Sequence, residues 1–291
     1  MKIFTYLIVF AILIISCKNE RMKDSKNSGY IQIDSSKIYY ESYGHGEPII
    51  LIHAGVTDMR MWDFQMDDLS KKFKVIRFDQ RGFGKSSIPK QKYNPVLDIL
   101  ALMNSCKIDK AHIVGISLGA LQAIDIAIEY PERVKTLIIS GASFPDWQLP
   151  KDILEKHIDF TSYVLENGPD SAVNRMLTDP FWSKSIPDKK YKNGRELFVR
   201  VLKENKQSFI VDWQLRNLPI GLPARLEDID CPVLMFRPEN EMPSIIPIAD
   251  TIADKISNIK ISTIADVSHL LNLEKPDYFN MGIIEFINDN Q

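Results

Sequence analysis

The feature that most constrains this chain is a serine set between two glycines, where an apolar segment gives way to a helical one. The run AHIVGISLGALQAIDIAIEYP occupies residues 111–131. Residues 111–114 have the apolar character of a buried strand. From Leu118 onward apolar side chains recur at helical spacing until Pro131 ends the pattern. The sequence therefore predicts a sharp strand-to-helix turn centred on Ser117.

Such a turn holds its central residue in a strained backbone conformation, which small neighbours make possible. Gly115 and Gly119 supply that room on either side of Ser117. The turn also sets the serine hydroxyl beside the free N–H groups of a helix, which can hold a developing negative charge. The G-x-S-x-G pattern therefore makes Ser117 a candidate nucleophile. A turn that merely packs a helix on a sheet is the alternative interpretation.

Strand-like and helix-like segments alternate along most of the chain. A hairpin is expected from residue 30, and apolar strands are expected in PIILIHAG, KVIRFDQRG, VKTLIISGA, PVLMFRPE and IKISTIAD. This alternation predicts an α/β fold with a mostly parallel sheet and helices on both faces. Residues 145–228 lack strong strands and are rich in helix formers and aromatic residues, so they are expected to form a helical cap. The core is then divided between residues 30–144 and 229–291.

The N-terminus has a different character. Lys2 precedes a segment without charged residues from Ile3 to Ile15, which is 13 residues long. As a helix it would extend about 20 Å, too short to span a hydrocarbon core of about 30 Å comfortably. Its length is that of a signal-peptide h-region. Residues 1–16 are therefore interpreted as a signal peptide, with an uncleaved membrane-inserted helix as the alternative.

The segment ends in IISC, which resembles the lipobox of bacterial lipoproteins. The resemblance implies that Cys17 receives a lipid and becomes the mature N-terminus, since two acyl chains suffice for stable anchoring. Residues 17–29 are expected to form a flexible tether. The expected location is the bacterial cell envelope, with the protein lipid-anchored to a membrane and facing outside the cytosol.

Composition restricts the partners. A net charge of −2 and the lack of a basic stripe give no reason to expect nucleic acid binding. Cys106 and Cys231 lie in apolar surroundings, and the chain has no CxxC pair or histidine-rich cluster. We therefore expect no metal, no cofactor and no obvious protein partner, but a small-molecule substrate.

A serine nucleophile needs a base, and the base needs an orienting acid. Of the five histidines, His269 follows the last expected strand, from which a loop can reach back over the sheet to the serine. The acid should also follow a strand end. That criterion leaves Glu239, Glu241 and Asp146 as candidates.

Taken together, five motifs resemble those of capped α/β-hydrolases over about residues 30–288. They are LIHAGVTDMRMWDFQ, FDQRGFGKS, VGISLG, CPVLMFRPENE and SHLLNLEKP, in the family's order. The resemblance implies that Ser117 is the nucleophile, His269 the base and Glu241 the acid. It implies oxyanion-hole amides at Leu118 and Gly55, with Val56 as a near alternative.

The chain departs from the family pattern at three positions. Ala54 replaces a glycine after His53, Pro238 replaces the glycine before the acid, and Glu241 stands where Asp is usual. The resemblance also implies that Arg81 secures a loop and that His53 shapes the oxyanion turn. Aromatic residues expected to line the substrate pocket are Phe144, Phe181, Trp182 and Trp213, with packing in the core of the cap as the alternative for the last three.

The expected function is therefore that of a serine hydrolase acting on a small carboxylic ester (the EC 3.1.1 class). A C–C bond hydrolase and a perhydrolase are alternatives on the same fold. A lipoprotein that binds an apolar ligand without catalysis is the alternative from another class.

The lipid anchor is tested by replacing its acceptor. Cys17→Ser should move the mature protein from the membrane to the soluble fraction or leave it unprocessed, because the thiol that carries the lipid is absent. Cell fractionation and intact mass measure both outcomes. Unchanged fractionation with unchanged mass would contradict the lipid anchor.

Overall fold

A computed structural model describes residues 27–291. The predicted signal peptide, Cys17 and the first part of the tether lie outside the described residues. Within residues 27–291 no helix has the length and apolar content needed to cross a bilayer.

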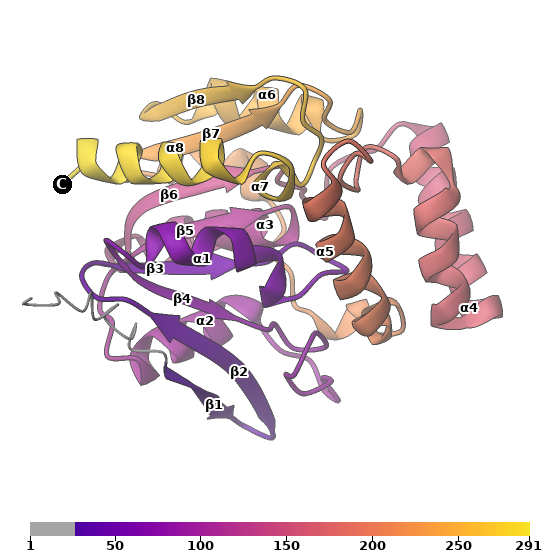
Figure 1. The fold of residues 1–291 in the computed structure, drawn as a ribbon, viewed down its shortest axis with the longest axis horizontal. Helices are drawn as coiled ribbons and strands as arrows, with labels where there is room; N and C mark the ends of the chain where they lie inside the picture. Colours follow the sequence, from indigo (N-terminus) through magenta and orange to yellow (C-terminus); the bar gives the residue numbers. More distant parts are fainter. Residues whose placement is uncertain (1–26) are drawn as a thin grey trace, which may run out of the picture.

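The fold is an α/β sandwich around one eight-stranded sheet (Figure 1). The strands are β1 (Asn27–Ile33), β2 (Ser36–Tyr43), β3 (Pro48–Ile52), β4 (Lys74–Phe78), β5 (Ala111–Ile116), β6 (Val134–Ser140), β7 (Val233–Pro238) and β8 (Ile259–Ile264). The helices are α1 (Asp63–Leu69), α2 (Pro95–Ser105), α3 (Leu118–Glu129), α4 (Lys151–Thr178), α5 (Lys192–Glu204), α6 (Ile246–Lys255), α7 (Leu271–Glu274) and α8 (Pro276–Asp289).

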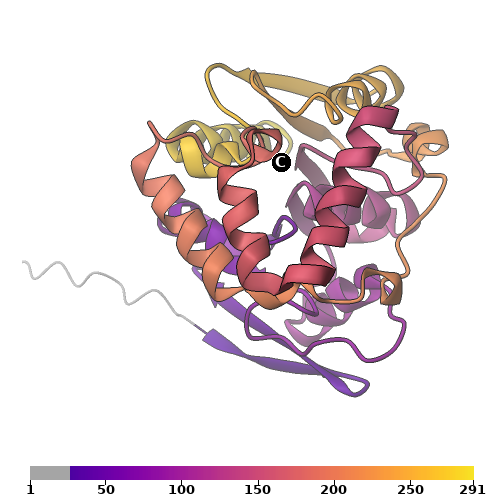
Figure 2. The same ribbon diagram turned by 90° about the vertical axis from the view of Figure 1, so that its right-hand side faces the viewer.

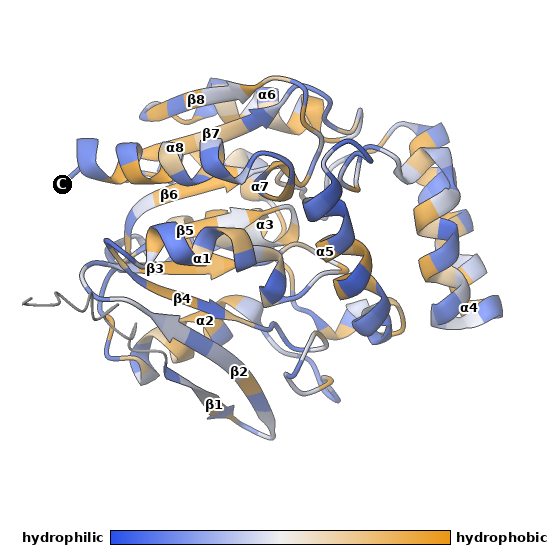
Figure 3. Cartoon of the chain, in the orientation of Figure 1, coloured by the Kyte–Doolittle hydropathy of each residue, from blue (hydrophilic) through white to orange (hydrophobic). Residues whose placement is uncertain are grey.

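The sheet is mostly parallel, as the sequence predicted. Its strand order is β1-β2-β4-β3-β5-β6-β7-β8. The β1–β2 and β2–β4 pairs are antiparallel, whereas every pair from β4 to β8 is parallel. Figure 3 shows the central strands coloured as hydrophobic, in contrast to the more polar β1 and β2 at the edge.

Alternate residues of one strand enter two different cores. Ile50 and Ile52 of β3 pack with residues of α2, α3 and α6. Ile49 and Leu51 pack with residues of α1 and α8 on the other face. Successive side chains of a strand point to opposite faces, so a strand buried on both sides must be apolar throughout.

The chain differs from expectation at the start of β1. Asn27, Ser28 and Gly29 pair with β2, although the sequence placed them in the tether. Their side chains are exposed or partly exposed, so no apolar pattern marks the strand. Backbone pairing to β2 extends the strand without burial of these side chains.

All of residues 145–228 are described, and they contain no strand. This segment, here called the cap, leaves the sheet after β6 and returns at β7. In Figure 1 its helices α4 and α5 stand to the right of the sheet, and Figure 2 looks onto them. α4 is broken at Gly168, whose φ of 78° and ψ of 174° are not helical, just before Pro169.

Candidate active site

Ser117 lies at the turn between β5 and α3. Its φ of 57° and ψ of −117° fall outside the helical and strand regions, a conformation that costs free energy for a residue with a side chain. The Ser117 N–H donates to the Ser140 carbonyl at the end of β6, at 2.9 Å. The turn is therefore fixed by the neighbouring strand, and its hydroxyl lies at the wall of a cavity.

Both glycines of the motif are required by close backbone contacts. A Cβ atom on Gly115 would lie 2.2 Å from the carbonyl oxygen of Gly119. A Cβ atom on Gly119 would lie 2.1 Å from the carbonyl oxygen of Ile52, at the end of β3. Each distance is far inside van der Waals contact, so the turn forms only if both positions lack a side chain.

His269 and Glu241 are joined by a buried hydrogen bond. His269 Nδ1 lies 2.8 Å from Glu241 Oε1, and the two residues are 4% and 5% exposed. The same carboxylate oxygen accepts the Met242 N–H at 2.7 Å. Since a carboxylate accepts hydrogen bonds, Nδ1 carries the proton, and Nε2 is left with a lone pair.

Ser117 and His269 line the same cavity. Within the described chain no hydrogen bond joins the Ser117 hydroxyl to the His269 ring. Unliganded active sites commonly hold such pairs at longer range than a hydrogen bond, and the contact shortens when substrate binds. The structure therefore brings a serine and a hydrogen-bonded imidazole–carboxylate pair to one cavity.

Gly141, which no sequence motif indicated, packs against the imidazole of His269. A Cβ atom here would lie 2.5 Å from His269 Cε1 and 2.8 Å from His269 Nδ1. Gly141 also has a φ of +60°, which favours glycine. The available signal was a glycine directly after an apolar strand.

His53 orients the loop that follows β3. The Gln80 N–H donates to His53 Nε2 at 3.1 Å, so the proton is on Nδ1, which donates to the Ala54 carbonyl at 2.8 Å. Burial lowers the pKa of His53 to about 4, so the ring is neutral at pH 7. The Thr57 hydroxyl donates to the same carbonyl, also at 2.8 Å.

The orientation of this carbonyl determines the direction of the next N–H. In a trans peptide the C=O and N–H bonds point in opposite directions. Since the Ala54 carbonyl faces His53 and Thr57, the Gly55 N–H faces away from them, and Gly55 lines the cavity. Leu118 is the first residue of α3, so its N–H has no acceptor within the helix.

The cavity has a volume of about 440 Å³. Residues after five parallel strands line it, including Gly55, Ser117, Phe144, Met242 and His269, together with the cap residues Met176, Trp182, Phe198 and Trp213. None of the described residues that line it is Asp, Glu, Lys or Arg. A bound molecule is therefore enclosed by apolar side chains with a few neutral polar groups.

Three of the four expected pocket residues, Phe144, Trp182 and Trp213, line this cavity. Phe181 does not, and lines a smaller neighbouring cavity. No feature of the sequence indicates which of the two neighbours, Phe181 or Trp182, lines the larger cavity. The difference arises from the single turn Pro180–Trp182, in which successive side chains point in different directions.

The other candidate acids lie elsewhere. Asp146 is exposed, and its Oδ2 accepts the Gly221 N–H at 2.7 Å. Glu239 Oε2 accepts the Asp266 N–H at 2.7 Å. Arg81 is buried and bonds both carboxylate oxygens of Asp98, as expected for a residue that secures a loop.

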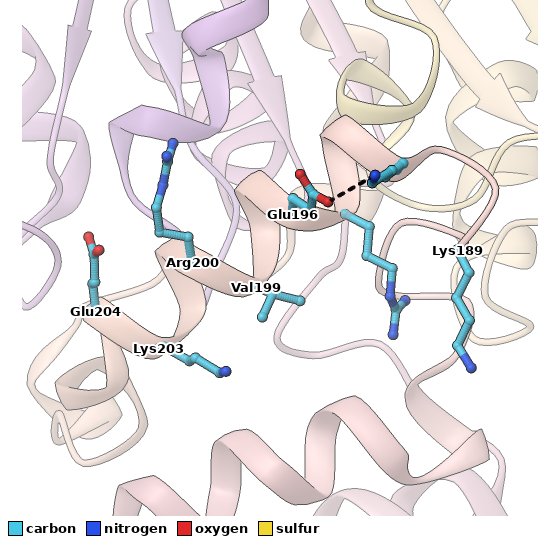
Figure 4. A pocket seen from close by; sticks show the side chains of 8 residues that line it. Lys189, Glu196, Val199, Arg200, Lys203 and Glu204 are labelled. Atoms are coloured by element: carbon cyan, nitrogen blue, oxygen red, sulfur yellow. Dashed lines mark ion pairs between the residues drawn. The ribbon is translucent and has the colours of Figure 1, made fainter.

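A hollow of about 650 Å³ along α5 is a different kind of surface (Figure 4). Lys189, Arg200 and Lys203 line it and are exposed, and Lys192 pairs with Glu196 at 4.0 Å. The residues that line it include no serine, cysteine or histidine. It therefore lacks the groups that nucleophilic chemistry requires.

The backbone contact at Gly119 gives a stability prediction. Gly119→Ala should lower the free energy of unfolding by about 1–3 kcal/mol or more, because its Cβ would overlap the Ile52 carbonyl. Gly29→Ala is the matched control, since its nearest contact would be Tyr40 at 3.9 Å, and it should change stability by less than about 0.5 kcal/mol. Urea denaturation measures both. Equal effects would show that the contact is not restrictive.

Comparison with known proteins agrees with this architecture. Residues 47–161 match the family model of the alpha/beta hydrolase fold. An uncharacterized carboxylesterase of Bacillus subtilis (strain 168) is 26% identical over 83% of this chain and 79% of its own length. A putative carbamate hydrolase of Azorhizobium caulinodans is 22% identical over 88% of this chain and 97% of its own.

Solved structures share the fold. A carboxylesterase structure from the ammonia-oxidizing thaumarchaeon Nitrososphaera gargenis has a TM-score of 0.77 and 21% identity, and the match covers 89% of this chain and 98% of that one. The sheet order, the strand-to-helix turn and these similarities lead to one conclusion. The chain is an enzyme of the α/β-hydrolase fold.

Proposed function

We propose that this enzyme is a serine hydrolase that cleaves a small, uncharged carboxylic ester by means of Ser117, His269 and Glu241. The observation that carries the proposal is the buried 2.8 Å hydrogen bond between His269 and Glu241, at the cavity that Ser117 also lines. That bond leaves Nε2 of the ring as the available base. The serine oxygen and the imidazole nitrogen then border the same apolar cavity.

In the proposed acylation, Ser117 Oγ forms a bond to the ester carbonyl carbon while its proton passes to His269 Nε2. The electron pair of the C=O bond moves to the carbonyl oxygen, which the Gly55 and Leu118 N–H groups stabilise. Collapse of this intermediate breaks the C–O bond to the alcohol, which takes the proton from His269 and leaves.

In the proposed deacylation, water gives a proton to His269 Nε2 as its oxygen attacks the acyl-enzyme. The second tetrahedral intermediate collapses to the carboxylic acid, and Ser117 regains its proton from the ring. Glu241 stabilises the imidazolium in both steps and holds the tautomer with Nδ1 protonated. It does not need to accept the proton itself.

The cavity favours an ester over the substrate of a C–C bond hydrolase. A diketone acid carries a carboxylate, and none of the described residues that line the cavity is a cation to pair with it. The relatives in Bacillus subtilis and Nitrososphaera gargenis are described as carboxylesterases. A perhydrolase would use the same acyl-enzyme with peroxide in place of water, so product analysis with and without peroxide distinguishes it.

We also propose that the enzyme is held at a membrane of the cell envelope through lipid on Cys17. The IISC lipobox resemblance supports this anchor. The enzyme would then encounter its ester substrate outside the cytosol.

The proposed boundaries of the cap, at residues 145 and 228, follow the change from strand-rich to helix-rich sequence.

The nucleophile and base are tested by labelling and turnover. A fluorophosphonate probe should label Ser117, and Ser117→Ala should abolish the label, because only an activated serine reacts. His269→Ala should lower ester turnover by about 10³-fold or more, since the three residues act as a unit. A folded protein that takes no label would instead favour a ligand-binding protein, and a loss below about tenfold in His269→Ala would indicate another base.

The acid is tested by a matched pair of neutral substitutions. Glu241→Gln should lower kcat for a nitrophenyl ester by about 10³-fold or more, because it removes the charge that fixes and stabilises the ring. Asp146→Asn, also at a carboxylate after a strand, should change kcat by less than about threefold. A larger loss of kcat in Asp146→Asn than in Glu241→Gln would place the acid after β6 rather than after β7.

A further inference from the structure

A second, smaller cavity, here called the outer cavity, adjoins the one that Ser117 and His269 line. Its volume is about 190 Å³, and Ile153, Phe181 and Ser183 of the cap are among the residues that line it. Four residues line both cavities, namely His157, Trp182, Met242 and Ser244. These four residues, here called the neck, lie where the two cavities adjoin. The proposed mechanism uses none of them.

His157 is the titratable residue of the neck. It lies on α4, and its ring meets Trp182 and Phe181 edge-on, with centroids 5.2 and 5.5 Å away. Neither ring nitrogen hydrogen-bonds to any described residue. The aromatic rings thus hold the imidazole in place without using its polar atoms.

The charge state of this ring limits what it can bind. Burial lowers the pKa of His157, so the ring is neutral at pH 7. A neutral imidazole offers one donor and one acceptor. Such a ring suits an uncharged polar group better than a carboxylate. Lys184 also lines the smaller cavity, but its side chain is exposed and it lies outside the neck.

Ser244 is the second polar group of the neck. It is partly buried, and its hydroxyl makes no hydrogen bond to a described residue. The other two neck residues, Met242 and Trp182, have apolar side chains. The neck therefore combines two hydrogen-bonding side chains with apolar walls, between two cavities that can hold apolar groups.

We propose that the longer arm of the ester passes through the neck into the outer cavity and carries there a neutral hydrogen-bonding group, a hydroxyl or an amide, that His157 binds. This inference rests on the proposed ester hydrolysis and names its substrate class. The shorter arm and the scissile bond remain in the catalytic cavity. His157 is then a specificity-determining residue, because a plain chain would leave its donor and acceptor unpaired.

The test compares nitrophenyl esters of one medium chain length, either unsubstituted or with one hydroxyl at successive carbons. The wild-type enzyme should prefer at least one hydroxylated isomer by about tenfold in kcat/KM. The selectivity ratio is kcat/KM for the preferred hydroxylated ester divided by kcat/KM for the unsubstituted ester. His157→Phe keeps the aromatic packing but removes both hydrogen-bonding atoms, so this ratio should fall to about one. His157→Gln keeps a donor and an acceptor and should retain most of the ratio.

His45→Phe is the matched control, because His45 lies in the exposed β2–β3 turn and lines neither cavity. Its selectivity ratio should equal that of the wild type. An unchanged ratio in His157→Phe, or a wild type without preference for any isomer, would overturn the inference.

A second variant tests the outer cavity by size. Ser183→Trp should fill part of it and shorten the longest acyl chain that the enzyme accepts, and an unchanged chain-length profile would overturn the threading of the arm. Fluorophosphonate labelling of Ser117 is measured in every variant. If His157→Phe is labelled and keeps the wild-type selectivity, only the proposed role of the neck is refuted. If the folded wild type takes no label, the proposed hydrolase activity is refuted, and the proposed substrate class with it.

Discussion

The close approach of two backbone segments, at Gly119 of α3 and Ile52 of β3, is the constraint on which the rest of the site depends. It brings the first turn of α3 against the end of β3. The free N–H of Leu118 and the loop at Gly55 consequently line one cavity with Ser117. A side chain at position 119 would separate these segments, and the two amides would no longer border the same space.

The sequence predicted the parts of the molecule that follow from local pattern. Apolar runs of strand length, such as residues 48–52, can only be buried on both faces, so they predicted a parallel sheet. The glycines around Ser117 predicted the turn because few other residues permit it. His269 could be selected because it follows the last strand, and parallel strands bring their carboxyl ends to one edge.

The remaining features depend on contacts that no local pattern encodes. Whether Phe181 or Trp182 enters the catalytic cavity depends on how the cap turns at Pro180, and the strand at Asn27 forms by pairing with β2 rather than by burial. His157 resembles any histidine on a partly exposed helix. Its position at the neck follows from the packing of α4, which Gly168 interrupts, against other cap segments that include Phe181 and Trp182.

The cap is also hydrogen-bonded directly to the loop that carries His269. The His269 N–H donates to the Lys184 carbonyl at 3.1 Å. Glu274 accepts the Asp188 N–H of the cap and both the N–H and the hydroxyl of Ser268, at 2.6 Å each. The segment that encloses the substrate is therefore hydrogen-bonded to the loop that carries the proposed base. A displacement of this segment would change the shape of the cavity and the position of the imidazole together, so substrate recognition and base orientation are not independent in this fold.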